Sequence, residues 1–172
     1  TSGTGPENGF SGLFFLRFAM KTVAIIPAGG SGKRVGAPMA KQYLLLHALP
    51  VLVRTLLVFQ KVEAISDIIV VVPGDDVLSV RKQVVEKYNL TKVAAVVAGG
   101  RQRQDSVACG LRAVKLPCDI VMVHDAVRPF VTEDMIIRVA AAAAGCGAAS
   151  LGVLAKDTIK ETTGDGIVKA TL

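Results

Sequence analysis

Short runs of apolar, mostly β-branched residues recur along the chain, and most are followed by loops rich in glycine or proline. Five such runs predict strands, at residues 22–26, 68–72, 93–98, 120–123 and 148–154. The runs are continuously apolar rather than alternating, which is typical of strands buried on both faces of a parallel sheet.

The segments between these runs predict helices. They cover residues 50–62, 75–88, 106–114 and 133–144. Pro50 suits a first helical turn. Asp105 or Ser106 is expected to cap the third helix, and Thr132 the fourth.

Strands that alternate with helices predict an α/β domain with a doubly wound, mostly parallel sheet. Ligands bind such sheets beyond the carboxyl ends of the strands, and the unusual residues of this chain lie there, at 29–41, 99–106 and 124–129. Near the C-terminus, the turn signal at residues 164–166 lies between the segments 158–160 and 167–168 and predicts that they pair as a β-hairpin.

The composition excludes several classes of protein. A length of 172 residues fits one domain, and 51% hydrophobic with 20% charged residues excludes a disordered chain. The spacing of Cys109, Cys118 and Cys146 favours neither a disulfide framework nor a zinc site. Residues 139–155 lack charge but are too short and too rich in alanine and glycine to span a membrane.

Positive charge is concentrated near the N-terminus. Residues 8–62 contain seven lysines and arginines and no acidic residue, while the rest of the chain is nearly balanced. Such a segment attracts an anion, which is either nucleic acid or the phosphate of a small ligand. Aromatic residues make up 5% of the chain, with no tryptophan, so there is little to stack on nucleic acid bases.

Met20 and Lys21, directly before the first strand, look like a natural start. We therefore interpret residues 1–19 as a leader, tag or upstream readthrough, with an organelle-targeting remnant as the alternative. The folded domain is expected over residues 20–172.

Residues 27–34 form a glycine-rich loop, PAGGSGKR. The loop is not a P-loop, because Pro27 and Arg34 replace the required glycine and Ser/Thr, and Val35 replaces the third glycine of a dinucleotide fingerprint. Its backbone N–H groups can still approach phosphate, with Lys33, Arg34 and Lys41 nearby. The acid-free surroundings favour phosphate over a solvated glycine turn.

Two further loops carry polar residues. In the first, Gly99 and Gly100 let a ligand lie against the backbone, although by itself this is an ordinary strand-to-helix loop. In the second, Asp125 and Arg128 could hold Mg²⁺ and an anionic ligand together, or form an ion pair that closes the loop. His124 is expected to be a packed residue at a strand end.

Together, these loops resemble the 2-C-methyl-D-erythritol 4-phosphate cytidylyltransferases of the non-mevalonate isoprenoid pathway, from residue 22 to residue 172. The matching motifs are PAGGSGKR at 27–34, KQY at 41–43, GGR at 99–101 with DSV at 105–107, HDAVRP at 124–129 and KDTIK at 156–160. The resemblance implies a nucleotidyltransferase (Rossmann-like) fold with a β-hairpin arm. The reaction it implies joins CTP and methylerythritol phosphate, giving the CDP-alcohol and pyrophosphate.

The resemblance also implies roles for particular residues. Arg34 and Lys41 would stabilise the transition state as the catalytic residues. The backbone expected to cradle the triphosphate is that of Ala28, Gly29, Gly30, Ser31 and Gly32. The residues expected to recognise cytosine are Gly100, Arg101 and Ser106. The substrate side would be formed by Asp125, Ala126, Arg128 and Thr158, with Asp125 also serving Mg²⁺ or another divalent cation.

In the family the hairpin arm crosses to a second subunit, so the resemblance implies a homodimer through residues 158–172. Family members continue past this point with an arginine and a lysine that hold the substrate phosphate, so we expect a C-terminally truncated chain. Neither a nucleic acid nor a membrane partner is expected. The expected location is the bacterial cytoplasm, with a plastid as the alternative.

Two other functions remain open from the sequence. A ribitol-5-phosphate cytidylyltransferase shares the HDAVRP motif, although the segment at 156–160 favours the isoprenoid enzyme. An inactive nucleotide-binding fragment is the second alternative.

Overall fold

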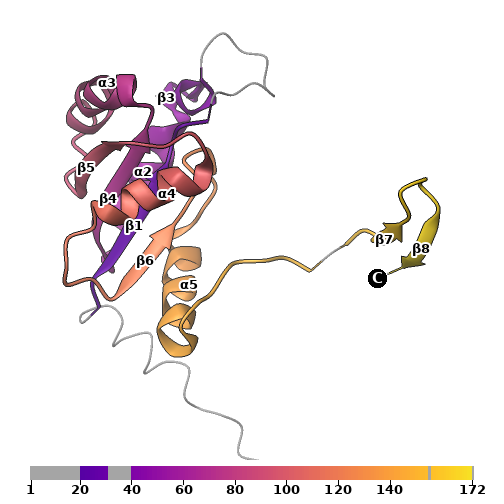
Figure 1. Cartoon of the computed structure of the whole chain (residues 1–172). Helices are drawn as coiled ribbons and strands as arrows, with labels where there is room; N and C mark the ends of the chain where they lie inside the picture. Colours follow the sequence, from indigo (N-terminus) through magenta and orange to yellow (C-terminus); the bar gives the residue numbers. More distant parts are fainter. Residues whose placement is uncertain (1–19, 31–39, 155, 172) are drawn as a thin grey trace, which may run out of the picture.

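The computed structural model describes residues 20–30, 40–154 and 156–171. Its centre is a parallel sheet in the order β5-β4-β1-β6 (Figure 1). The strands are β1 (Thr22–Pro27), β4 (Ile65–Val72), β5 (Val93–Ala98) and β6 (Ile120–Val123). Because β4 and β6 lie on opposite sides of β1, the strand order changes direction at β1, as in a doubly wound sheet.

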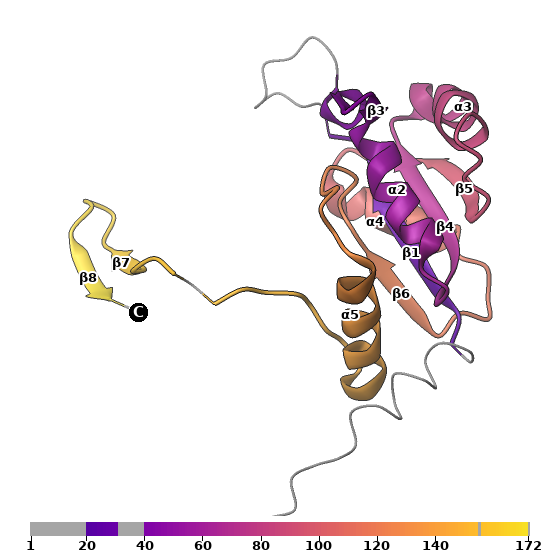
Figure 2. The same ribbon diagram turned by 180° about the vertical axis from the view of Figure 1, so that it is seen from behind.

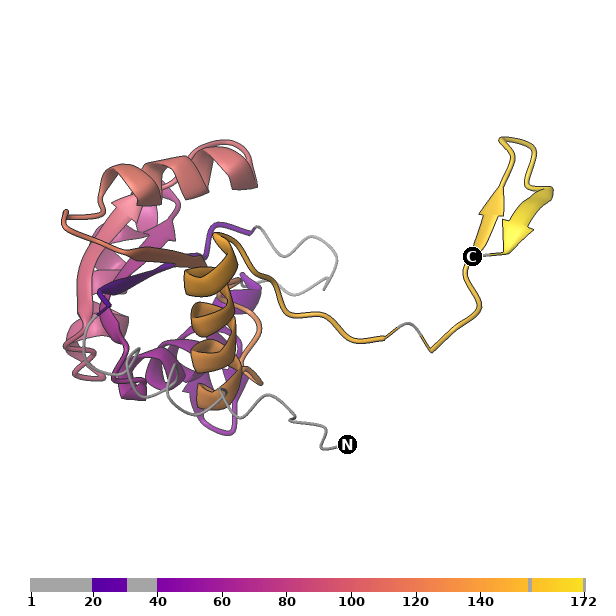
Figure 3. The same cartoon turned by 90° about the horizontal axis from the view of Figure 1, so that it is seen from below.

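Helices cover both faces of this sheet. One face carries α4 (Arg103–Arg112), in front of the sheet in Figure 1. The opposite face carries α2 (Val51–Lys61) and α5 (Glu133–Cys146), seen in front in Figure 2. Seen from below in Figure 3, the sheet lies between these layers. The predicted α/β architecture is therefore confirmed.

The apolar runs of the central strands β1 and β4 are buried because helices cover both faces of the sheet there, whereas the edge strands β5 and β6 are only partly buried. Ala24 and Ile26 face the α2 side, whereas Ile25 faces α4, and all three are fully buried. From α2, Leu56 and Phe59 pack into the same core. Burying side chains of this size stabilises the fold by about 1.5–3 kcal/mol each.

Two helix starts differ from those predicted. The third helix begins at Arg103 with Gln102 as its N-cap, so neither Asp105 nor Ser106 is the capping residue. Asp105 instead accepts a hydrogen bond from the Gln102 backbone N–H at 3.0 Å, from inside the first turn. This is the reciprocal half of a capping box, which local sequence alone does not distinguish from an N-cap. Pro50 directly precedes α2 rather than starting it.

The fourth helix starts as predicted. The hydroxyl of Thr132 accepts a hydrogen bond from the Met135 backbone N–H at 3.3 Å, which caps α5.

The expected helix over residues 75–88 is divided into three parts. A 3₁₀ turn, η2 (Gly74–Asp76), leads into α3 (Val77–Val80) and then into a π-helical segment, η3 (Arg81–Glu86). In all three helix types, residues three to five positions apart lie on the same side of the helix. The apolar spacing in the sequence therefore predicts a single helix and does not distinguish the three types.

Sequence reasoning also missed a small hairpin before α2. It consists of β2 (Leu45–Leu46) and β3 (Leu49–Pro50), joined at His47 and Ala48, whose φ angles are 47° and 64°. This is the left-handed backbone of a two-residue turn, usually occupied by Asn or Gly. The Arg54 guanidinium donates hydrogen bonds to the carbonyls of Leu46 and His47, which holds the turn against α2.

The predicted strand at residues 148–154 is wrong. The segment is extended but is not paired with any described strand, and Val153 and Leu154 are more than 90% exposed. An apolar run becomes a strand only when a neighbouring strand accepts its backbone hydrogen bonds.

The C-terminal hairpin is confirmed. It pairs β7 (Lys160–Thr162) with β8 (Val168–Thr171) in antiparallel register, and Gly166 adopts a φ of 85° in its turn. Both strands begin slightly later than the sequence suggested. Figures 1 and 2 show that the hairpin stands away from the sheet.

Candidate active site

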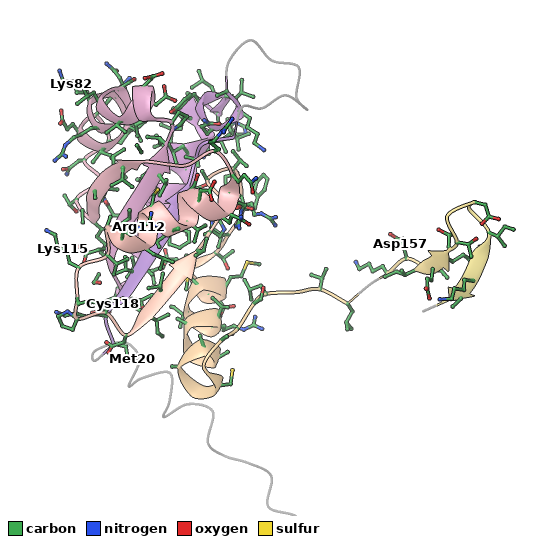
Figure 4. The ribbon with its side chains drawn as sticks, in the orientation of Figure 1. Met20, Lys82, Arg112, Lys115, Cys118 and Asp157 are labelled. Carbon is green, nitrogen blue, oxygen red and sulfur yellow. The ribbon has the colours of Figure 1, made fainter. Side chains whose placement is uncertain are left out.

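Three of the predicted loops meet at one edge of the sheet. They follow the carboxyl ends of β1, β5 and β6, and the end of β4 lies between two of them. The opposite edge carries the amino ends of β1 and β6, near the Met20 and Cys118 labelled in Figure 4. Parallel pairing thus gathers loops that are nearly 100 residues apart in sequence.

The loop after β1 is tied to its surroundings at Ala28. The Ala28 backbone N–H donates to the carbonyl oxygen of Val71 at 2.7 Å, and its own carbonyl accepts from the Gln42 side-chain amide at 2.7 Å. Gly29 and Gly30 continue into solvent. The predicted phosphate-binding residues Ser31 and Gly32, and the predicted catalytic Arg34, lie outside the described residues.

Lys41 lies directly beside this loop. It is the first residue of the 3₁₀ turn η1 (Lys41–Tyr43). A Cβ atom built on Gly30 would lie 3.5 Å from Lys41 Cε and 4.0 Å from Lys41 Nζ. Within the described part of the chain, no side chain or backbone group forms a hydrogen bond or ion pair with the Lys41 ammonium. The structure therefore brings an available cation to the expected phosphate loop.

The loop after β5 is shaped by its contact with α4. A Cβ on Gly99 would lie 2.7 Å from the Ser106 hydroxyl oxygen, and one on Gly100 would overlap Cβ of Asp105. The Ser106 hydroxyl accepts a hydrogen bond from the Gly100 backbone N–H at 3.2 Å and donates to the Gln102 carbonyl at 3.1 Å. Both glycines are thus required by helix packing, and Ser106 holds the loop that carries Gly100 and the exposed Arg101.

The loop after β6 places Asp125 between two arginines. Asp125 Oδ1 accepts hydrogen bonds from Arg103 Nε at 3.1 Å and Arg103 Nη2 at 2.9 Å. Asp125 Oδ2 accepts from Arg128 Nε at 3.0 Å. The expected Asp125–Arg128 ion pair is present, and the sequence reasoning did not single out Arg103 as its second partner.

Opposing effects act on this carboxyl group. Partial burial raises its pKa, but hydrogen bonds and charge from Arg103 and then Arg128 outweigh burial and lower the pKa of Asp125 below its ordinary value. Asp125 is therefore ionised at neutral pH, and it orients two guanidinium groups at the carboxyl edge of the sheet.

Ala126 links two of the loops. Its backbone N–H donates to the Pro27 carbonyl at 3.2 Å, and its carbonyl accepts from the Thr55 hydroxyl of α2 at 2.8 Å. Both backbone polar groups are thus engaged inside the fold. Thr158 is exposed on the segment leading to the hairpin, so the structure does not bring it to the other predicted site residues.

His124 is packed, as expected. Its ring lies 5.0 Å from the Phe59 ring, centroid to centroid, at an angle of 54°. Burial is the largest cause of the lowered pKa of His124, so the ring is neutral near pH 7.

An apolar groove of about 700 Å³ lies between β6 and α5, and its lining reaches Asp125 and Arg128. Val123 of β6 and Met135 of α5 contribute to its walls. The groove gives the two charged side chains an apolar neighbour.

The described residues do not form a metal cage. Across residues 20–30, 40–154 and 156–171, no three His, Cys, Asp or Glu side chains are grouped closely enough to hold an ion. Both oxygens of Asp125 accept hydrogen bonds from guanidinium groups, and Oδ2 retains a second lone pair. The role of Asp125 toward a divalent cation therefore stays a prediction.

Within the described residues, no helix combines the length and apolar character needed to cross a membrane.

Comparison with known proteins gives one consistent family. The model of the family described as IspD, 2-C-methyl-D-erythritol 4-phosphate cytidylyltransferase, matches residues 22–172. A relative of that name from Syntrophus aciditrophicus is 50% identical over 152 residues, covering 88% of this chain and 65% of the relative. Another, from Geobacter metallireducens, is 48% identical over 155 residues, covering 88% and 66%. The chain thus spans slightly less than two thirds of these relatives.

Solved structures agree with this match. The 4-diphosphocytidyl-2C-methyl-D-erythritol synthase of Anaerococcus prevotii superposes with a TM-score of 0.72 at 28% identity, covering 89% of this chain and 64% of that one. The 2-C-methyl-D-erythritol 4-phosphate cytidylyltransferase of Thermus thermophilus gives a TM-score of 0.60 at 27% identity, with the same coverage of 89% and 64%. The family match, the identity to these relatives and the superpositions lead to the same conclusion: the chain belongs to the 2-C-methyl-D-erythritol 4-phosphate cytidylyltransferase family.

Proposed function

We propose that this chain carries the active site that transfers a cytidylyl group from CTP to 2-C-methyl-D-erythritol 4-phosphate. The observation that supports it best is the Lys41 ammonium, which lies beside Gly30 at the carboxyl edge of the sheet without a partner among the described contacts. In this family, that edge is where the motif loops would meet a nucleotide.

The chemistry needs charge and alignment more than proton transfer. A phosphate oxygen of the alcohol phosphate attacks the α-phosphorus of CTP, a new P–O bond forms, and the bond to the β-phosphate oxygen breaks to release pyrophosphate. The attacking oxygen is already anionic, so no general base is required. The two polyanions must be held in line, and the charge on the α-phosphate must be neutralised.

Each loop then has a role. The backbone from Gly29 to Gly32 would hold the triphosphate, with Ala28 anchoring the loop through its own two hydrogen bonds. Lys41 would lie next to the transferring phosphate, and Arg34 would share this role. Gly100, Arg101 and Ser106 would form the cytosine side. Asp125, Arg128 and Thr158 would serve the alcohol phosphate, while the buried Ala126 holds their loop to Pro27 and Thr55, and Arg103 orients Asp125.

We propose that Mg²⁺ or another divalent cation arrives with CTP, because phosphate oxygens are ligands that Mg²⁺ prefers. We also propose a homodimer formed through the arm at 158–172, whose Ile167 and Val168 are exposed. The relatives come from bacteria, which supports a bacterial cytoplasmic location over a plastid.

The test is pyrophosphate release from CTP and Mg²⁺ by the 172-residue chain, with methylerythritol phosphate, with ribitol 5-phosphate and with no acceptor. Release only with methylerythritol phosphate, abolished by a chelator, supports the proposal. Release only with ribitol phosphate would replace it with the other cytidylyltransferase. CTP binding without release from any mixture would show a nucleotide-binding chain that does no chemistry.

A further inference from the structure

The two residues after Lys41 both attach its turn to the sheet. Gln42 is only 2% exposed, and its side-chain amide donates to the Ala28 carbonyl oxygen at 2.7 Å. The Tyr43 hydroxyl donates to Asp76 Oδ2 at 3.0 Å. Among the described residues, the turn's own backbone bonds run from Tyr43 N–H to Ala40 at 2.9 Å and from Leu44 N–H to Lys41 at 3.3 Å, and its last carbonyl, that of Leu44, accepts from Val51 N–H of α2 at 3.0 Å.

The two attachment points follow different strands. Ala28 follows β1, whereas Asp76 lies in η2, beyond the end of β4. These strands are neighbours, with Pro27 opposite Val71 in the sheet. The Lys41 turn is therefore fastened across the ends of two adjacent strands, and this fixes the position of its backbone relative to Gly30.

The Tyr43 hydrogen bond has a stable donor. Burial, followed by the hydrogen bond and charge of Asp76, raises the pKa of Tyr43 well above that of a free tyrosine. The hydroxyl keeps its proton throughout the neutral range, so the attachment to Asp76 is present wherever the enzyme would work.

We propose that Tyr43 is a positioning residue for cytidylyl transfer: through Asp76, and together with Gln42, it holds the Lys41 ammonium over Gly30. Tyr43 itself contacts no reacting atom in this scheme. The proposal rests on the function proposed above, because it assigns Tyr43 to the catalytic placement of Lys41.

The chain supplies its own control, because Tyr43 and Tyr88 are its only tyrosines. Tyr43→Phe removes one hydroxyl and is expected to lower kcat by about 10- to 100-fold, the scale of a displaced catalytic group. KM for CTP and the thermal midpoint should change no more than in Tyr88→Phe. Asp76→Asn keeps an acceptor oxygen and should retain most of kcat, whereas Asp76→Ala should match Tyr43→Phe.

A second readout does not depend on turnover. Reductive ¹³C-methylation labels the lysines, and Lys41→Arg identifies the Lys41 signal in an NMR spectrum. Tyr43→Phe is expected to move this signal in the free protein and to weaken its response to inorganic triphosphate, while Tyr88→Phe leaves both unchanged.

The outcomes separate the two proposals. An unchanged kcat and an unchanged Lys41 signal in Tyr43→Phe would overturn the positioning role, as would an equal loss of kcat in Tyr88→Phe. If no variant releases pyrophosphate but only Tyr43→Phe moves the Lys41 signal, Tyr43 holds Lys41 and the proposed reaction is wrong.

Discussion

At the scale of single residues, the site is a set of cations whose positions depend on a few neutral or acidic partners. Asp125 holds Arg103 and Arg128, whereas Lys41 has no such partner among the described contacts and depends on the turn that carries it. This difference separates residues that would act on phosphate from residues that order the loops.

Lys41→Ala is expected to lower the rate of pyrophosphate release by at least about 100-fold, the effect of losing one oriented charge in a transition state. Lys61→Ala is the matched control, because Lys61 is an exposed lysine at the end of α2. An unchanged turnover number in Lys41→Ala would remove Lys41 from the catalytic role.

The arginine pair should make Asp125 resistant to acid. The folded-state pKa of Asp125 is lowered, so its contribution to stability is present above the unfolded value, about 3.9, and is lost as the pH falls through the folded value. Arg103→Gln is expected to move this loss to higher pH. The check is the thermal midpoint across the acid range, from about pH 2 to about pH 6, with Arg112→Gln as the control; coincident curves for the two variants would contradict it.

At the scale of elements, the close approach of α4 to the sheet explains several glycines. From the sequence alone, we interpreted some of them as ligand contacts and assigned no role to others. A Cβ built on Gly110 of α4 would lie 2.5 Å from Ile25 Cγ2 and 3.1 Å from Val71 Cγ2. Both partners are buried strand residues on the α4 face. Gly110 therefore sets the distance between α4 and the sheet, and so the position of Arg103 and Ser106 at the start of that helix.

Gly110→Ala is expected to lower the free energy of unfolding by about 1–3 kcal/mol, the cost of overpacking a core. Gly145→Ala is the matched control in α5, because nothing lies within 4 Å of its added Cβ. There alanine should stabilise the helix by about 0.5–1 kcal/mol. Urea unfolding measures both, and equal changes of the same sign would refute the packing argument.

Helices and strands were predicted best where residues close together in sequence are enough to determine them. The strand at residues 93–98 and the Thr132 cap were predicted correctly, because a run of apolar, β-branched residues and a capping hydroxyl are both signals carried by residues close in sequence. The strand at 148–154 failed because its pairing depends on a neighbour that the described sheet does not provide.

At the scale of the whole molecule, the sheet domain and the C-terminal hairpin are separate parts (Figure 1). The hairpin carries exposed apolar side chains, including Ile167 at 64%. A two-stranded hairpin is marginally stable by itself in water, so a second surface that covers it would stabilise it.

If the arm mediates dimerisation, Ile167→Glu should convert the dimer to a monomer in sedimentation equilibrium. Leu116→Glu is the control, since Leu116 is also largely exposed but lies before β6, outside the arm. A monomeric parent chain, or a dimer that survives Ile167→Glu, would contradict the proposed arm contact.

The sequence alone determined the α/β architecture, the motif loops and the presence of the hairpin, because strand burial, helical spacing and turn residues act over a few positions. Only the tertiary structure revealed the partners: Arg103 with Asp125, 22 residues apart, Tyr43 with Asp76, 33 apart, and Gln42 with Ala28, 14 apart. These contacts depend on the strand order β5-β4-β1-β6, which sets which loops are neighbours. The strand order follows from how all the layers pack together, and no local pattern contains that information.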